Sequence, residues 1–201
     1  ASDVYKRQFE ERQYAYLGRK YANYYERWLE NSLKERNKPV YHIVRAEDMP
    51  WELSKQGIIK HIHNEYMGGG ESTLDAYMQI IPPRSRSGKH RHMSPEVFFV
   101  LEGSGYDLHQ DAVPVIDKSS FRWKWDDKVK EYKWHKNCLV IVPPWTTHQH
   151  INTGDEPVRL LSITSRVVKK IGLNWIDQLD VAPEYLSGER LEQILENLKI
   201  K

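Results

Sequence analysis

Hydrophobic and polar positions follow three patterns along the chain, and the first and last of them predict helices. Across residues 4–37, aromatic and aliphatic side chains recur every three or four residues with Glu, Arg and Lys between them, as in an amphipathic helix. Near the other end, after residues 187–188, aliphatic residues occupy the i, i+3, i+4 and i+7 positions of a short helix. The two stripes comprise Tyr14, Leu17, Tyr21, Tyr24, Tyr25 and Trp28, and then Leu191, Ile194, Leu195 and Leu198. We therefore expect an N-terminal helical extension at residues 1–38 and a C-terminal tail with a short helix at residues 169–201.

The middle of the chain has the pattern of an all-β domain. Short runs rich in Val, Ile, Phe, Tyr and Thr alternate with clusters of Gly, Pro, Ser and Asp, and the runs lie at residues 74–81, 97–101, 138–142 and 158–164. Closely spaced strands separated by such turn residues predict an antiparallel barrel or sandwich, which we assign to residues 39–168. Residues 110–136 are long, charged and aromatic, and we interpret them as an insertion between two strands.

Composition argues against a nucleic-acid-binding protein, a membrane protein and a disulfide-stabilised protein. Lys and Arg number 30 against 28 for Asp and Glu, and a net charge of +2 gives no reason to expect a nucleic-acid partner. The longest apolar runs are too short to span a bilayer, and residues 1–10 are charged, so we expect neither a membrane segment nor a signal peptide. One cysteine, Cys138, excludes an internal disulfide and makes a cytoplasmic setting the default. Because the aromatic N-terminal stripe should not stay exposed, we expect a homodimer.

Four side chains form a candidate metal site. His90 and His92 are two residues apart, so in a strand both imidazoles point to the same face, and Glu96 follows with the same parity. About fifty residues later another apolar strand leads through a Pro-Pro-Trp segment to His148. Three imidazoles and one carboxylate suit a divalent transition metal, and in an octahedral field they leave two positions for substrate oxygens, O₂ or water.

This arrangement resembles the cupin family over residues 74–165. His90, His92, Glu96 and Gly103 match the spacing of the first cupin motif, and Asn137, Pro143, His148 and Asn152 match that of the second. Three family glycine positions differ and hold Arg84, Asn137 and Trp145, of which Trp145 should alter its local turn. The resemblance implies a double-stranded β-helix, the cupin jelly-roll barrel, with a metal bound inside its mouth. It does not choose a reaction, because cupins include dioxygenases, decarboxylases, isomerases, lyases and binding proteins.

A closer resemblance favours one reaction. Residues 142–150, read as VPPWTTHQH, look like a segment of gentisate-dioxygenase-type cupins, and the HRH sequence of residues 90–92 is also similar to theirs. Those enzymes open a hydroxylated aromatic ring with ferrous iron and O₂, and typically bind the iron through three histidines without a glutamate. The resemblance implies a mononuclear Fe(II) dioxygenase acting on a small oxygenated aromatic or enolisable carbonyl substrate.

Two alternatives stay open at this point. The same barrel could carry a non-redox lyase, decarboxylase or isomerase that uses Zn, Ni or Mn, or it could bind a small ligand without catalysis. His150 shares strand parity with His148, so we expect it to face the cavity as a catalytic proton acceptor, and Tyr106 is a second candidate base. His61 and His63 form another H-x-H pair, which we interpret as an ordinary strand pair because no glutamate follows at the right distance.

Overall fold

The computed structural model describes residues 23–37, 41–64, 73–173 and 175–200. The chain divides into two compact units, Ala1–Pro39 and Val40–Lys201, and each is described by itself.

In the first unit, the described part is helix α2 (Tyr24–Arg36). Four apolar side chains at helical spacing are exposed on it, namely Tyr25, Trp28, Leu29 and Leu33. Tyr14, Leu17 and Tyr21 of the expected stripe lie outside the described residues. The homodimer stays a prediction.

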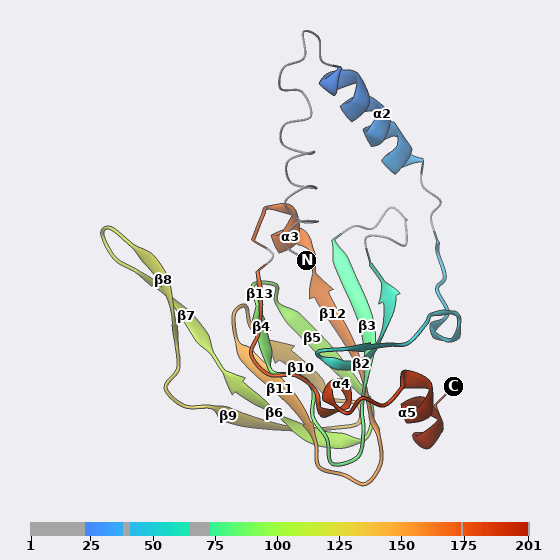
Figure 1. The fold of residues 1–201 in the computed structure, drawn as a ribbon. Helices are drawn as coiled ribbons and strands as arrows, with labels where there is room; N and C mark the ends of the chain where they lie inside the picture. The colour runs from blue at the N-terminus through green and yellow to red at the C-terminus, as the bar shows by residue number, and fades with distance from the viewer. Residues whose placement is uncertain (1–22, 38–40, 65–72, 174, 201) are drawn as a thin grey trace. The chain divides into compact units, whose positions relative to one another are not determined.

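The second unit is built from two antiparallel sheets that form the expected jelly-roll barrel (Figure 1). The six-stranded sheet has the order β1 (Glu52–Ser54), β2 (Gly57–His63), β3 (Leu74–Ile81), β12 (Val158–Ser165), β5 (Glu96–Glu102) and β10 (Leu139–Val142). The five-stranded sheet has the order β13 (Ile176–Gln178), β4 (His90–His92), β11 (Thr147–Asn152), β6 (Ser104–Gln110) and β9 (Lys130–His135). The all-β fold predicted from the alternation of strand runs and turn residues is confirmed.

The core lies between the sheets because alternate side chains of each strand point inward. Phe98 and Val100 of β5 pack with Leu160 of β12, and Trp134 of β9 meets the Phe98 ring edge-on at 6.2 Å between centroids. These residues are almost completely buried. Burial of this apolar surface at roughly 25 cal/mol per Å² is the main force that closes the barrel at this end.

The C-terminal segment covers the outer face of the six-stranded sheet. Helix α5 (Leu191–Asn197) places Ile194 against Ile58 and Ile80 of β2 and β3, and its other apolar residues pack around this contact. The remaining helices among the described residues of this unit are one-turn elements, η1 (Ala46–Asp48), α3 (Val167–Lys170) and α4 (Pro183–Leu186). The amphipathic stripe of α5 is therefore used for packing on the barrel.

The segment expected as an insertion is only partly one. β7 (Ala112–Ile116) and β8 (Phe121–Trp125) form a separate hairpin that projects from the barrel (Figure 1). β9, however, pairs with β6 along its whole length and contributes Trp134 to the core. The sequence of β9 is polar, and only Trp134 is buried. One buried residue is too weak a hydrophobic pattern to predict a barrel strand. Likewise β13, which follows residue 168, pairs with β4 and extends the barrel beyond the expected boundary.

The three positions where the cupin motif usually has glycine keep a left-handed backbone. Arg84, Asn137 and Trp145 have φ values of 53°, 71° and 64°. Side chains other than glycine adopt this region at a cost of roughly 1 kcal/mol each. At Trp145 the strain is offset by its N–H bond to the His92 carbonyl at 2.8 Å and by near-complete burial of the ring. Trp145 therefore occupies a left-handed turn position of the kind that favours glycine.

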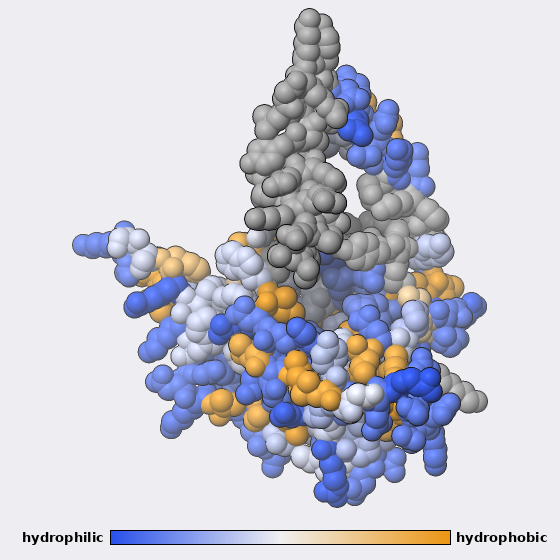
Figure 2. All heavy atoms as spheres, viewed as in Figure 1, coloured by the Kyte–Doolittle hydropathy of each residue, from blue (hydrophilic) through white to orange (hydrophobic). Residues whose placement is uncertain are grey.

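No helix in the described part of the chain is long and apolar enough to cross a membrane. On the face seen in Figure 2, hydrophobic residues form several separate groups among hydrophilic ones.

Candidate metal centre

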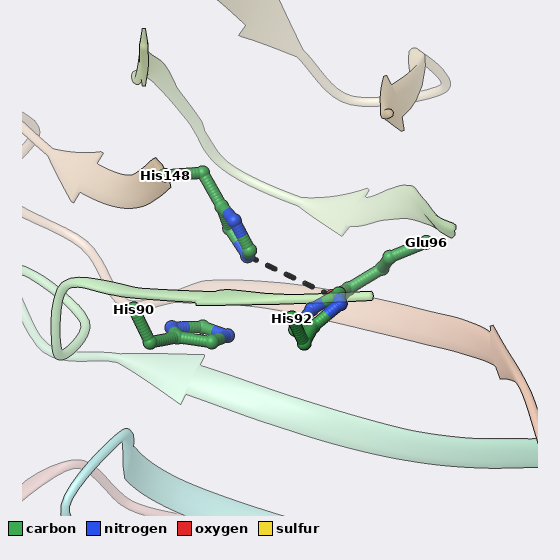
Figure 3. A group of neighbouring side chains, drawn as sticks. All are labelled: His90, His92, Glu96 and His148. Atoms are coloured by element: carbon green, nitrogen blue, oxygen red, sulfur yellow. Dashed lines mark hydrogen bonds and ion pairs between the residues drawn. The ribbon is translucent and has the colours of Figure 1, made fainter. Parts of the chain in front are cut away.

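Strand pairing brings the four predicted ligands together at one end of the barrel. His90 of β4 lies directly opposite His148 of β11 in the antiparallel register, and His92 follows on the same face of β4. Glu96 is the first residue of β5 and approaches from the other sheet. One potential ligand atom from each residue lies within 4.8 Å of all the others, and the side chains converge (Figure 3).

Backbone carbonyls orient all three imidazoles. The Nδ1 atoms of His90, His92 and His148 lie 3.3, 2.7 and 3.0 Å from the carbonyl oxygens of residues 88, 94 and 146. A carbonyl accepts but cannot donate, so each Nδ1 carries the hydrogen and each Nε2 is the atom left for other partners. The Nε2 atoms of His90 and His148 are buried and have no hydrogen-bond partner among the described residues. Buried lone pairs without partners are costly, and a metal ion is the group that would satisfy them together.

Glu96 has two oxygens with different roles. Tyr77 donates a hydrogen bond of 3.0 Å to Oε1, and the Ser162 hydroxyl donates to the same oxygen. Oε2 faces the histidines, 2.9 Å from Nε2 of His92 and 3.7 Å from Nε2 of His148. The carboxylate is therefore held by one oxygen and offers the other to a cation.

The electrostatics of the cluster suit a cation. Burial lowers the pKa of His90 to about 4 and that of His148 well below its ordinary value, so both are neutral, as metal ligands must be. Burial opposes ionisation of Glu96, but the hydrogen bond from His92 and the positive charge of His92 help to outweigh it and lower the pKa of Glu96. The same contact outweighs burial at His92 and raises its pKa. A divalent cation between His92 and Glu96 would replace this ion pair.

The cluster opens into a cavity of about 460 Å³. His90, His92 and Glu96 form part of its wall, and Trp175 and Ile176 contribute apolar surface. The exposed Lys55 adds a positive charge to the lining. A cavity of this size with a few polar groups fits a small organic molecule.

The two residues expected to act as bases are placed differently from the ligands. His150 is 1% exposed and faces the barrel interior, but it is not among the residues that line the cavity. Phe98 covers its ring at 4.6 Å between centroids. Tyr106 is on the opposite face of β6 from the buried Asp107 and His109 and does not line the cavity either, so its assignment as a base was wrong.

Asp107 forms a second buried polar cluster beside the first. Its carboxylate accepts hydrogen bonds from His150 Nδ1 at 2.9 Å, Trp134 Nε1 at 2.9 Å and His109 Nε2 at 3.1 Å. Burial opposes ionisation, but the charge of His150 and these donors outweigh it and lower the pKa of Asp107 to about 2. The charge and hydrogen bond of Asp107 likewise outweigh burial at His150 and raise its pKa. His150 is therefore fixed by Asp107 and is not part of the cavity lining.

Sequence reasoning missed the residues that support the ligands. Tyr77 and Ser162 lie opposite each other on β3 and β12, a pairing that residue spacing does not reveal. The position of Asp107 could have been predicted in part. It is two residues from His109 on a strand that follows the first motif, so both side chains should point to the same face. His61 also lines the cavity, although we had interpreted it as part of an ordinary strand pair.

Comparison with known proteins places this architecture in a family. The family model described as auxin binding protein matches residues 41–179, which include all four clustered side chains. The chain belongs to the auxin-binding-protein family. As a member of this family it is a cupin, as the two motifs had indicated.

Curated relatives of this family member include both enzymes and binding proteins. The 5-aminosalicylate 1,2-dioxygenase of Comamonas sp is 29% identical over 121 residues, 58% of this chain and 27% of that protein. The gentisate 1,2-dioxygenase of Streptomyces sp is 28% identical over 126 residues, 59% of this chain and 30% of that protein. Auxin-binding protein 1 of Arabidopsis thaliana is 30% identical over 102 residues, 51% of this chain and 47% of that protein. The chain thus matches less than half the length of each of these three.

Solved structures agree on the fold. Oxalate decarboxylase from Bacillus subtilis matches 78% of this auxin-binding-protein family member and 36% of its own chain, with a TM-score of 0.51 and 14% identity. Another oxalate decarboxylase structure has a TM-score of 0.53 over 81% of this chain and 38% of that one, at 15% identity. At this identity the similarity shows a shared barrel.

Proposed function

We propose that the protein is a mononuclear non-haem Fe(II) dioxygenase that acts on a small oxygenated aromatic substrate. The observation that carries the proposal is the convergence of three oriented imidazoles and one carboxylate at the wall of a 460 Å³ cavity. Relatives named as dioxygenases of gentisate and 5-aminosalicylate support the choice of O₂ chemistry and of an aromatic substrate class. An enolisable carbonyl compound is the other substrate class whose oxygens a metal held by these four residues could bind.

His90, His92, Glu96 and His148 would hold the iron. When bound, iron would supply a Lewis acid and a redox centre to which substrate oxygens and O₂ can coordinate. The set of nitrogen and oxygen donors fits such an ion, because the two unpartnered Nε2 atoms need an electron-pair acceptor.

The remaining groups of the protein prepare the site. Tyr77 and Ser162 keep Oε2 of Glu96 turned towards the histidines. Trp175 and Ile176 provide a partly apolar wall against which an aromatic ring can pack. Lys55 favours a substrate that carries a negative charge.

Oxygen consumption tests the proposal. The protein would be loaded with Fe(II) under anaerobic conditions, assayed for bound iron, and exposed to O₂ with dihydroxybenzoates, aminosalicylates and 1,3-diketones. We expect uptake of O₂ with at least one aromatic substrate and none with the His148→Ala variant. Iron-loaded protein that consumes no O₂ with any of these compounds would contradict the proposal.

Ligand binding without turnover is the second candidate, and the family match favours it. The same panel separates the two functions. An aromatic compound that binds the metal-loaded protein in calorimetry but causes no O₂ uptake would support a binding protein.

A further inference from the structure

Three tryptophans connect the projecting hairpin to the wall of the cavity. Trp125 is the last residue of β8, Trp145 lies in the turn between β10 and β11, and Trp175 directly precedes β13. The rings of Trp125 and Trp145 are 6.5 Å apart between centroids, and those of Trp145 and Trp175 are stacked at 6.5 Å with 24° between their planes. Both separations lie in the range in which aromatic rings attract each other. Trp175 lines the cavity, so the series of rings ends at the candidate binding site.

Trp145, the middle ring, is firmly held. The residue is 7% exposed, its N–H donates to the His92 carbonyl at 2.8 Å, and its own carbonyl accepts a hydrogen bond of 3.0 Å from Nε1 of Trp125. Glycine would adopt the left-handed backbone at this position with less strain, so the contacts of the side chain are what tryptophan adds here. The stack with Trp175 is one of these contacts.

Arg91 joins the same elements by a second route. Its guanidinium lies over the Trp125 ring, 4.1 Å from the centroid, and is 5.6 Å from the centroid of Trp145. Its Nε donates to Oδ2 of Asp177 at 2.7 Å, and Asp177 lies on β13, two residues after Trp175. Attraction between the cation and the rings and the ion pair with Asp177 both favour this arrangement. The base of the hairpin is therefore linked to the segment that carries the cavity wall.

Trp175 depends on such support because it is 57% exposed, so burial does not by itself fix the orientation of its ring. A side chain that has to become ordered when a ligand binds lowers the affinity, whereas one that is already held in place does not. The hairpin β7–β8 forms a sheet of its own, and the hydrogen bond from Trp125 attaches it to the barrel at this point (Figure 1).

We infer that Trp125 is a positioning residue for ligand binding. Through Trp145 it holds Trp175 in the orientation against which a flat ligand packs. The inference rests on the aromatic ligand of the proposed function but not on any reaction with O₂. It gives the hairpin a role in binding although no residue of β7 or β8 is part of the cavity lining.

Fluorine NMR of metal-free protein labelled with 5-fluorotryptophan tests the coupling without a ligand. Each of the seven tryptophans contributes one signal, and Trp175→Phe identifies that of Trp175. Trp125→Phe keeps an aromatic ring but removes the Nε1 donor, so the Trp175 signal should shift and broaden. Trp123→Phe, two residues earlier on the same strand, is the matched control and should leave that signal in place. An unchanged Trp175 signal in Trp125→Phe, or the same change in both variants, would overturn the inference.

Calorimetry with Fe(II)-loaded protein under argon measures the effect on binding. 2-Hydroxybenzoate and oxalate both offer two oxygens to a metal, but only the first has a ring. Trp125→Phe should lower the affinity for 2-hydroxybenzoate about threefold and leave that for oxalate unchanged, and Trp175→Ala should lower the affinity for 2-hydroxybenzoate about tenfold. Adding Trp125→Phe to Trp175→Ala should cause no further loss, because Trp125 acts through Trp175.

The outcomes separate this inference from the proposed function. Equal losses of affinity for both compounds would reveal a general structural effect and contradict the inference, as would additive losses in the double variant. Losses confined to 2-hydroxybenzoate, without O₂ uptake on any substrate, would contradict the dioxygenase and support the role of Trp125. Failure of 2-hydroxybenzoate to bind the wild-type protein would overturn the inference, whereas O₂ uptake with another substrate would still support the proposed function.

Discussion

The hydrogen bond from Tyr77 to Glu96 provides a direct test of how the carboxylate is held. Replacing Tyr77 with Phe removes one donor from Oε1 and leaves the Ser162 hydroxyl as its other donor. The bond is 3.0 Å long, and both partners are buried, with Glu96 only 1% exposed. A hydrogen bond to a charged group contributes roughly 1.5–3 kcal/mol, so we expect the free energy of unfolding of the metal-free protein to fall by about 2 kcal/mol.

The same change should weaken metal binding. Removal of a group that orients a metal ligand typically lowers affinity about 10- to 100-fold, and the lower value is expected here because Ser162 remains. Chelator competition would give the metal affinity, and urea unfolding of the metal-free protein would give the stability. Tyr132→Phe is the matched control, since Tyr132 is 43% exposed on β9 and is not a cavity residue. Tyr77→Phe combined with Ser162→Ala should cost more than the sum of the two single changes, because both act on one oxygen.

The reasoning would be refuted if the metal affinities of Tyr77→Phe, Tyr132→Phe and the wild-type protein were all the same. Loss of stability without loss of metal affinity would show that Tyr77 only fills the core. Additive effects in the double variant would mean that the two hydroxyls do not share Glu96.

Three further predictions concern the buried polar residues. His148→Ala should abolish metal retention, whereas Glu96→Ala should weaken it because three imidazoles remain; equal loss of metal on elemental analysis would contradict this ranking. His150→Ala should keep its metal but lower turnover with little change in substrate affinity, because the His150 ring lies 5.6 Å from the His148 ring between centroids and helps to position it; loss of the metal or wild-type turnover would refute this role. Asp107→Asn should lower the free energy of unfolding at neutral pH by about 2–4 kcal/mol, because an amide offers one acceptor to three donors, while Asp127→Asn, at an exposed turn position, should have no measurable effect. Because the pKa of Asp107 is lowered to about 2, its contribution is complete above about pH 4 and is lost as the pH falls towards about 2, so the two proteins should converge in urea titrations there.

The clustering of the four candidate ligands could be predicted from sequence because it follows in part from strand periodicity. His90 and His92 need only one strand and a period of two to share a face. The pairing of His90 with His148 joins segments far apart in the chain, and it became predictable through the resemblance to a family whose motifs have this spacing. The strands at residues 74–81 and 158–164 could be predicted from local sequence, because their β-branched and aromatic residues are bounded by turn residues.

The supporting residues could not be predicted, because they act through contacts that periodicity does not encode. Tyr77 and Ser162 meet Glu96 from two other strands, and neither belongs to a recognisable motif. Tyr106 was assigned to the site from its residue type, but the register with β11 turns it to the outer face. The segment containing Trp134 appeared to be a charged insertion because one inward side chain is too weak a pattern to reveal a strand.

Backbone groups orient the histidines of one sheet, whereas side chains orient the glutamate of the other. In the five-stranded sheet, a backbone carbonyl lies within 3.3 Å of Nδ1 of each of the three histidines, so the path of the backbone orients all three rings. In the six-stranded sheet, Glu96 depends on the side chains of Tyr77 and Ser162, and His61 of the same sheet lines the cavity. Substitutions on β2, β3 and β12 can therefore change the strength of the carboxylate ligand and the shape of the cavity while the imidazoles stay in place. This separation gives a physical reason why one cupin barrel can hold a metal in a constant way and still differ in the molecules it accepts.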